Sequence, residues 1–206
     1  NMSMHTWFEC KIRYEKLMEN GMNKKVTEPY LVDALSFTEA EARIIEEMTP
    51  FITGEFTVSD IKRANYSELF PSEEESADRW FKCKLIFITL DEKSGAEKKT
   101  STQVLVQAAD LRDAVKKLDE GMKGTMADYQ IGMVSETSIV DVFPYETKEG
   151  SNTTEDKEVV RFIDKFPEGQ CTETTVGGKP VIVDKTGGKT KVIPNNKSDT
   201  NEGDQQ

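Results

Sequence analysis

Two stretches of the chain alternate apolar and polar residues with the period of a half-buried β-strand. In WFECKIRY (7–14), Phe8 and Cys10 alternate with charged neighbours, and WFKCKL (80–85) repeats the pattern. Successive side chains of a strand point to opposite faces, so one face of each strand is expected in a core. We therefore predict a strand at each place, with Cys10 and Cys83 as small core residues.

A helical pattern lies downstream of each predicted strand. In YLVDALSFTEAEARIIEEM (30–48) and VLVQAADLRDAVKKLDEGM (104–122), apolar residues recur at three- and four-residue spacing in the later part of the segment. This spacing is typical of a helix with one apolar side. Ser36 or Thr38 is expected to cap the first helix. Before it, Asn20-Gly21 is a strong signal for a hairpin turn.

The two halves of the chain match in order, which indicates an internal duplication. With an offset of 73 or 74 residues, Trp7 aligns with Trp80 and Phe70 aligns with Phe143. An ordered series of matches is more specific than any single motif. Each copy has the pattern of strand, strand, helix and strand, and the last strand is predicted to end at Phe-Pro because proline lacks an amide donor.

These patterns predict an α+β fold. Two tandem β-β-α-β repeats, at residues 5–72 and 78–145, are expected to form one pseudo-twofold domain over residues 4–145. A single repeat would bury only one sheet face under one helix and would be marginally stable alone.

The chain after residue 145 does not match the repeats. We expect a polar linker at 146–157, and then a short docking segment and a β-hairpin within 158–194 that turns at Gly187-Gly188. Residues 195–206 contain no apolar side chain and are predicted to form a disordered acidic tail.

Composition narrows the classes of function. The net charge is −11, which weakens any hypothesis of a broad basic face for nucleic acid. No apolar run approaches the roughly 18–20 residues that span a bilayer, and the start of the chain lacks a secretory pattern. The three cysteines have no metal-binding spacing. We expect a protein of the cytoplasm that does not enter membranes.

Catalytic signals in the sequence are poor. His5 is the only histidine, so no nucleophile and base pair involving histidine can be assembled. No phosphate-binding glycine loop is present. The sequence therefore predicts a protein that is not an enzyme and that uses no cofactor and no metal.

The other face of the predicted strands carries aromatic and basic residues together. A tryptophan beside lysines on a sheet face is typical of a stacking platform for single-stranded nucleic acid, and further lysines lie in both hairpins. The alternative is that each tryptophan lies beneath the other repeat or at the seam between the repeats. The candidate binding residues are Trp7, Lys11, Arg13, Lys24, Lys25, Trp80, Lys82, Lys84, Lys98 and Lys99.

The motifs WFECK, KKVTEPYLVDALSFTEAEARI and WFKCK resemble a family of unknown function from Bacteroides-type bacteria and their mobile elements, over residues 5 to about 145. The resemblance implies no activity, cofactor or site residue. Two hypotheses stay open: a non-catalytic protein that binds single-stranded nucleic acid, in a phage or mobile element, and a protein-interaction or structural module. The acidic tail could recruit protein partners. The sequence does not fix the oligomeric state.

Overall fold

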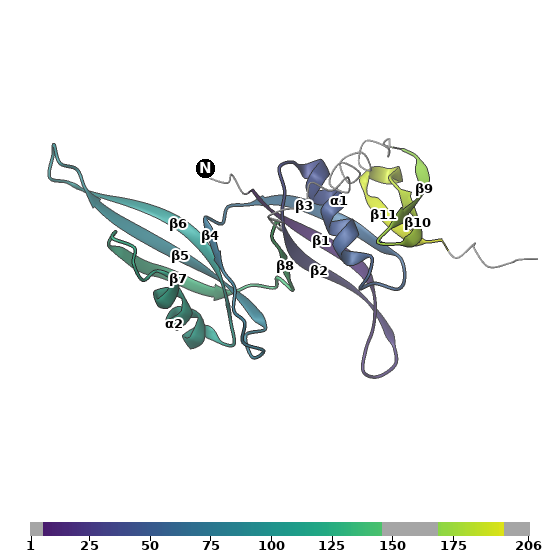
Figure 1. The fold of residues 1–206 in the computed structure, drawn as a ribbon, viewed down its shortest axis with the longest axis horizontal. Helices are drawn as coiled ribbons and strands as arrows, with labels where there is room; N and C mark the ends of the chain where they lie inside the picture. The colour runs from purple at the N-terminus through teal and green to yellow at the C-terminus, as the bar shows by residue number, and fades with distance from the viewer. Residues whose placement is uncertain (1–5, 146–168, 196–206) are drawn as a thin grey trace, which may run out of the picture. The chain divides into compact units, whose positions relative to one another are not determined.

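The computed structural model describes residues 6–145 and 169–195, which form two compact units (Figure 1). Unit 1 contains the described residues up to Arg63 and from Asp141 onward, and unit 2 contains Ala64–Val140. Strands predominate and two helices are present, so the predicted α+β class is confirmed. The expected single domain over 4–145 differs from this division, because each unit has its own sheet. The predicted linker at 146–157, the docking segment before residue 169 and the tail after Asn195 lie outside the described residues.

Unit 1 is a seven-stranded sheet with one helix, and its strands run in the order β8-β2-β1-β3-β11-β10-β9. Its elements in chain order are β1 (Trp7–Leu17), β2 (Asn23–Asp33), α1 (Phe37–Met48), β3 (Phe56–Ala64), β8 (Val142–Phe143), β9 (Cys171–Val176), β10 (Lys179–Asp184), the 3-10 turn η1 (Thr186–Gly188) and β11 (Thr190–Pro194).

Unit 2 is a four-stranded sheet with one helix, and its strand order is β4-β6-β5-β7. Its elements are β4 (Glu68–Phe70), β5 (Arg79–Leu90), β6 (Glu97–Ala108), α2 (Leu111–Gly121) and β7 (Tyr129–Glu136). Neither α1 nor α2 is long and apolar enough to cross a membrane, and no other helix of that kind occurs in the described residues.

The β1–β2 hairpin forms as the alternation and the Asn-Gly signal predict. The strands pair antiparallel from Trp7 opposite Asp33 to Leu17 opposite Asn23. Gly21 closes the turn with a φ of 78°, a left-handed conformation that glycine adopts without strain.

Both helices begin at a capping side chain. Ser36, one of the two predicted caps, accepts a hydrogen bond from the Glu39 amide at 3.1 Å. Asp110 does the same for the Asp113 amide at 2.8 Å. Each cap satisfies an amide that the first turn of a helix leaves unpaired.

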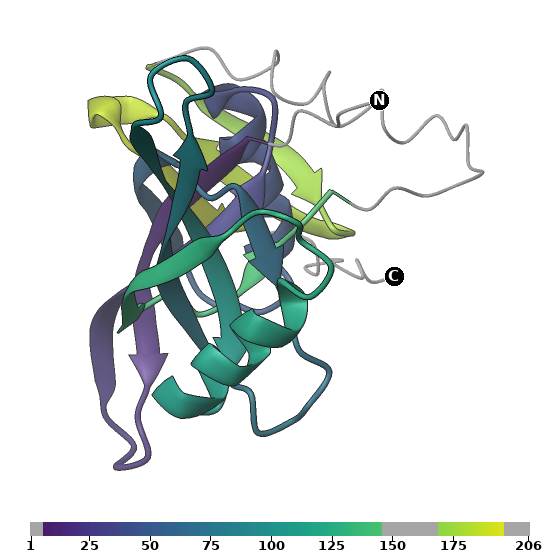
Figure 2. The same cartoon turned by 90° about the vertical axis from the view of Figure 1, so that its left-hand side faces the viewer.

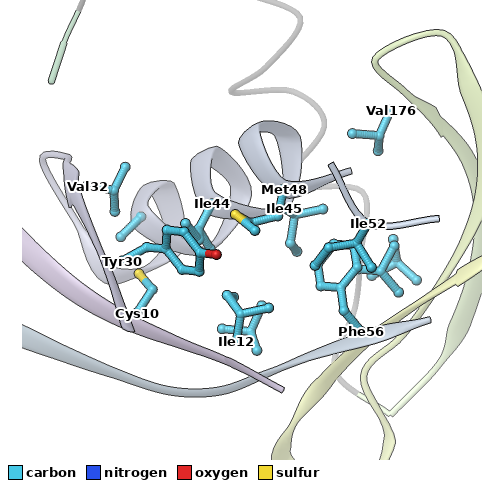
Figure 3. Close-up of a cluster of buried hydrophobic side chains, with 14 of the residues drawn as sticks. Cys10, Ile12, Tyr30, Val32, Ile44, Ile45, Met48, Ile52, Phe56 and Val176 are labelled. Atoms are coloured by element: carbon cyan, nitrogen blue, oxygen red, sulfur yellow. The ribbon is translucent and has the colours of Figure 1, made fainter. Parts of the chain in front are cut away.

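The predicted strand faces are confirmed by burial. Phe8, Cys10 and Ile12 lie in the core of unit 1. Figure 3 shows Cys10 and Ile12 on the side of the sheet that faces the apolar residues of α1. Phe81 and Cys83 lie in the corresponding core of unit 2. Burial of apolar surface at these positions supplies the main driving force for folding of each unit.

The predicted third strand of each repeat is wrong in its extent. It is split into β3 and β4 in the first repeat, and into β7 and β8 in the second. In the second repeat, Glu136 pairs opposite Phe81, close to the start of β5 at Arg79. The strand therefore reaches the end of its partner, and the chain turns away before a short further strand forms.

The two short strands cross between the units. β4 follows β3 of unit 1 but pairs in unit 2, and β8 follows β7 of unit 2 but pairs in unit 1. β4 pairs parallel with β6, with Phe70 opposite Val106, and lies in unit 2. β8 pairs parallel with β2, with Phe143 opposite Val32, and lies in unit 1. Each sheet is thus completed by a strand from the other predicted repeat.

The predicted C-terminal hairpin is confirmed, but it belongs to a larger element. β10 and β11 pair antiparallel around Gly187-Gly188, and the unpredicted strand β9 pairs on the other side of β10. β11 pairs with β3 and extends the sheet of unit 1. We call β9, β10 and β11 the C-terminal module; its Val176, Val181, Val183 and Val192 contribute to the core of unit 1.

Candidate functional site

The candidate site lies at the distal part of the β1–β2 hairpin, which extends past α1 (Figure 1 and Figure 2). On β1, Arg13 alternates with the core-facing residues and is exposed. Lys25 on β2 pairs opposite Glu15, two residues along β1 from Arg13. The hairpin therefore places two predicted cations on neighbouring strands.

A pocket of about 300 Å³ opens beside these cations. Its lining residues come from β1, β2, the start of β3 and β11, and they are Arg13, Tyr14, Glu15, Lys25, Glu55, Phe56, Thr57 and Lys191. β3 begins only at Phe56, so the end of β1 has no neighbouring strand on that side within the described residues. The uncovered edge leaves the space that forms the pocket.

The pocket is cationic although the protein is acidic. Three basic side chains line it, against the two carboxylates of Glu15 and Glu55. Lys191 forms an ion pair with Glu55 at 3.0 Å, whereas Arg13 and Lys25 form no ion pair with any described residue. The Arg13 guanidinium and the Lys25 ammonium are therefore available for an anion. Arginine presents paired N–H groups that match phosphate oxygens.

A polar network fixes the strand beside the pocket. The Glu28 carboxylate accepts hydrogen bonds from the Tyr14 hydroxyl at 2.8 Å, the Tyr30 hydroxyl at 3.0 Å and the Lys16 ammonium at 3.3 Å. Burial opposes ionisation of Glu28, but these three hydrogen bonds together hold its pKa below the usual value. Burial, and then the bond to Glu28, raise the pKa of Tyr14 to about 12. Tyr14 is thus a neutral donor held in place at the pocket wall.

Both tryptophans are placed differently from a stacking platform. Trp7 is 8% exposed and Trp80 is 4% exposed, and neither belongs to the core cluster of its unit. A ring that stacks on bases must offer an open face. The interpretation of Trp7 and Trp80 as exposed stacking residues is therefore corrected: both indoles are buried side chains.

The predicted basic residues do not form one site. Lys24, Lys98 and Lys99 are exposed like Arg13 and Lys25, whereas Lys11, Lys82 and Lys84 are half-buried. Of all these residues, only Arg13 and Lys25 line the pocket.

The corresponding hairpin of unit 2 has a different chemistry. Ile86 stands at the position that matches Arg13. It packs over Gly132, where an added Cβ would lie 2.9 Å from its Cδ1 atom. Lys99 matches Lys25 but has an isoleucine instead of an arginine near it, so the two hairpins are not equivalent as cationic surfaces.

Lys191 is a pocket residue that sequence reasoning missed. It lies on β11, outside the matched repeats, and it reaches the pocket because β11 pairs with β3, where it stands opposite Thr57. The basic composition of KTGGKTK (185–191) was the only local signal.

The cysteines have the properties of core residues. Burial raises the pKa of Cys10 to about 12 and that of Cys83 to about 11, so both thiols stay protonated and weakly nucleophilic. Cys171 is exposed, and a hydrogen bond with Asp184 raises its pKa. Within residues 6–145 and 169–195, no group of three or more histidine, cysteine or acidic side chains is arranged to hold a metal.

Comparison with known protein families finds one family model that matches this chain. The model of a domain of unknown function (DUF4494) matches residues 6–145, so the match covers both predicted repeats and stops before the C-terminal module. No curated protein and no solved structure gives a significant match.

Proposed function

Because the chain belongs to the DUF4494 family, a domain family of unknown function, we propose a function from the site itself: a non-catalytic protein that binds the phosphate backbone of single-stranded nucleic acid. The observation that carries the proposal is the pocket lined by Arg13, Lys25 and Lys191, two of which have no acidic partner in the described part of the chain. Cations in this arrangement attract phosphate oxygens and release counterions when they bind.

The shape of the pocket favours a flexible strand. A recess of about 300 Å³ between strands admits a phosphate and its sugar. A single strand can bend to place one phosphate there, whereas the regular backbone of a duplex offers its phosphates along a convex surface. The buried tryptophans supply no stacking, so the proposed binding depends little on base sequence.

The test is a titration of a fluorescent oligonucleotide of about 30 nucleotides with the full chain, followed by anisotropy in roughly 50 mM salt, where charges are weakly screened. We expect saturable binding of a single strand and weaker binding of the matched duplex. Arg13→Gln/Lys25→Gln should lose most of the affinity. No binding of the unmodified protein at tens of micromolar would refute the proposal.

Lys62→Gln is the matched control. Lys62 is exposed, pairs with Asp60 at 3.3 Å and lies outside the pocket. Its substitution changes the net charge without changing the site, so affinity should stay within about twofold. The double variant Lys98→Gln/Lys99→Gln measures whether the second hairpin also takes part, as the sequence predicts.

A protein-interaction module is the second candidate function. The observation that favours it is the open outer edge of β7, the last strand in the sheet of unit 2. An exposed strand edge is a ready template for pairing with another chain. If the oligonucleotide titration shows no binding, the interaction module remains as the candidate function, including partners that the predicted acidic tail could recruit.

We also propose that the chain arose by duplication of one β-β-α-β unit. The caps support this, because Asp110 and Asp113 follow Ser36 and Glu39 by 74 residues and make the same hydrogen bond. In addition, Glu39 accepts from the amide of the residue before its cap at 2.7 Å, and Asp113 does so at 3.0 Å.

The short strands support the duplication in the same way. Phe143 stands opposite Val32, and Phe70 stands opposite Val106. Phe143 matches Phe70 and Val106 matches Val32 in the repeat alignment, so each short strand pairs with the second strand of the other repeat. In an experimental structure, residues 7–63 of unit 1 should superpose on residues 80–136 of unit 2 by their strands and helix, with β8 of unit 1 falling on β4 of unit 2. Unrelated positions for the two Phe-Pro pairs would contradict the duplication.

The organism and the cellular compartment belong to the same proposal. The resemblance implies Bacteroides-type bacteria and their mobile elements, and three free cysteines fit the reducing cytoplasm. Fractionation of expressing cells should recover the chain with cytoplasmic proteins; recovery from the periplasm would contradict this.

A further inference from the structure

The outer edge of β7 is open and unprotected. β5 pairs with one side of β7, and no strand pairs with the other side within residues 6–145 and 169–195. The strand sequence YQIGMVSE contains no lysine and no proline. The partly open strand β2 does carry such residues, at Lys24, Lys25 and Pro29. Lysine and proline are the usual means of blocking an edge, so β7 lacks that protection.

The corresponding edge in unit 1 is occupied. β11 pairs antiparallel with β3, and Thr190 stands opposite Val58 while Val192 stands opposite Phe56. An offset of 73 residues places Phe56 and Val58 at Tyr129 and Ile131 of β7. The chain therefore contains one example of a strand that fits an edge of this kind.

The difference in cover is visible in the burial of the core residues. Phe56 is 2% exposed and Val58 is 5% exposed, because valines of the C-terminal module pack beside them. Tyr129, Ile131 and Val134 pack against the core of unit 2 but are only half-buried. Unit 2 thus has apolar surface beside β7 that a further strand would cover.

The backbone of β7 presents its free amides to this edge. The Ile88 amide donates to the Asp128 carbonyl at 3.2 Å, so residues 88 and 128 form a hydrogen-bonded pair. Pairs alternate along an antiparallel ladder, and the amides of Tyr129 and Ile131 therefore point away from β5. Donors at alternate residues are what an added antiparallel strand requires.

We infer that the β7 edge binds an extended strand of a partner protein by β-strand addition. The strand runs antiparallel to β7 and carries β-branched residues at alternate positions, as β11 carries Thr190 and Val192. Those side chains cover Tyr129 and Ile131, while main-chain hydrogen bonds supply affinity. The inference takes its register from the proposed duplication and does not involve the nucleic-acid pocket.

The probe is a fluorescent peptide with the β11 sequence GGKTKVIPN (187–195), titrated with the full chain. We expect saturable binding, and slower hydrogen exchange in residues 129–136 when the peptide is present. The same peptide with Val192→Asp places a carboxylate over the apolar residues and should not bind. Faster exchange in β11, without slower exchange in residues 129–136, would mean that the peptide had displaced the chain's own β11, which would overturn the inference.

Variants of β7 test the edge directly. Ile131→Pro removes an outward amide without removing a bond to β5, and should weaken peptide binding at least about fivefold, the ratio that corresponds to one net hydrogen bond. Ile131→Val keeps the amide and should bind like the unmodified chain. If Ile131→Pro does not fold, Ile131→Lys keeps the ladder and should weaken binding through its charge.

Two results would overturn the inference. The first is no change in hydrogen exchange at peptide concentrations up to about 1 mM, the limit of useful affinity. The second is protection of the Tyr129 and Ile131 amides in the chain alone, because the edge would then already be occupied. Oligonucleotide binding is unaffected by either result, so failure here is distinct from failure of the proposed function.

Discussion

Replacement of Phe8 by alanine tests the assignment of strand faces in unit 1. The ring is fully buried and packs edge-on against Phe37, with ring centroids 4.9 Å apart. Loss of a buried phenyl ring costs about 3–5 kcal/mol, because the transfer energy is lost and a cavity remains. We expect Phe8→Ala to lower the free energy of unfolding by that amount in urea titrations with an unchanged slope.

A double-mutant cycle separates the aromatic contact from the rest of this loss. Phe37 is 47% exposed, so Phe37→Ala should cost far less than Phe8→Ala. The coupling between the two substitutions should be about 0.5–1.5 kcal/mol, the usual value for an aromatic pair. Phe51→Ala is the control, because Phe51 is 73% exposed and its loss should change stability by less than about 0.5 kcal/mol.

The refuting result is a small effect of Phe8→Ala. A loss below about 1 kcal/mol is typical of a partly exposed side chain and not of a core ring. It would mean that Phe8 faces outward and that the alternation in β1 has been assigned to the wrong faces.

Four further predictions concern a helix cap, two pH dependences and the C-terminal module. Ser36→Ala should destabilise the protein by about 1 kcal/mol in urea titrations, with no effect expected from Ser36→Asp. Glu28 has a lowered pKa in the folded state, so its contribution to stability is present above its unfolded pKa and is lost as pH falls through the folded value. Glu28→Gln should therefore reduce the change in the free energy of unfolding between about pH 5 and 3. Tyr14 has a raised pKa, so stability should fall as pH rises from 10 toward 12, and Tyr14→Phe should reduce this fall. Glu41 accepts from Lys185 and from the Thr190 hydroxyl, both at 2.9 Å, so Glu41→Ala should cost about 1–3 kcal/mol and speed hydrogen exchange in β11, and unchanged exchange there would contradict the contact.

Local patterns were sufficient for much of the fold. The faces of β1 and β5 follow from alternation, because Phe8, Cys10, Phe81 and Cys83 are all buried where a half-buried strand requires it. The turn at Asn20-Gly21 and the cap at Ser36 follow from residues that satisfy their own backbone. These features depend on neighbours within a few positions, which a sequence displays directly.

Features that depend on distant segments could not be predicted. A pattern of apolar residues does not show where a strand loses its partner, so the breaks between β3 and β4 and between β7 and β8 were missed. Alternation separates Trp7 and Trp80 from the core clusters of their units, but it cannot tell whether their side of the sheet meets solvent. Lys191 joined the site only through the pairing of β11 with β3, which no local signal indicates.

The dependence of affinity on salt tests the central claim most directly, because it counts the phosphate contacts. If Arg13 and Lys25, the two pocket cations without an ion pair in the described residues, each neutralise one phosphate of a single strand, the logarithm of the binding constant should fall with the logarithm of salt with a slope of about −1.4. Arg13→Gln/Lys25→Gln should bring the slope close to zero, and Lys62→Gln should leave it unchanged. Equal slopes in the unmodified protein and the double variant would contradict the pocket as the site of nucleic-acid binding.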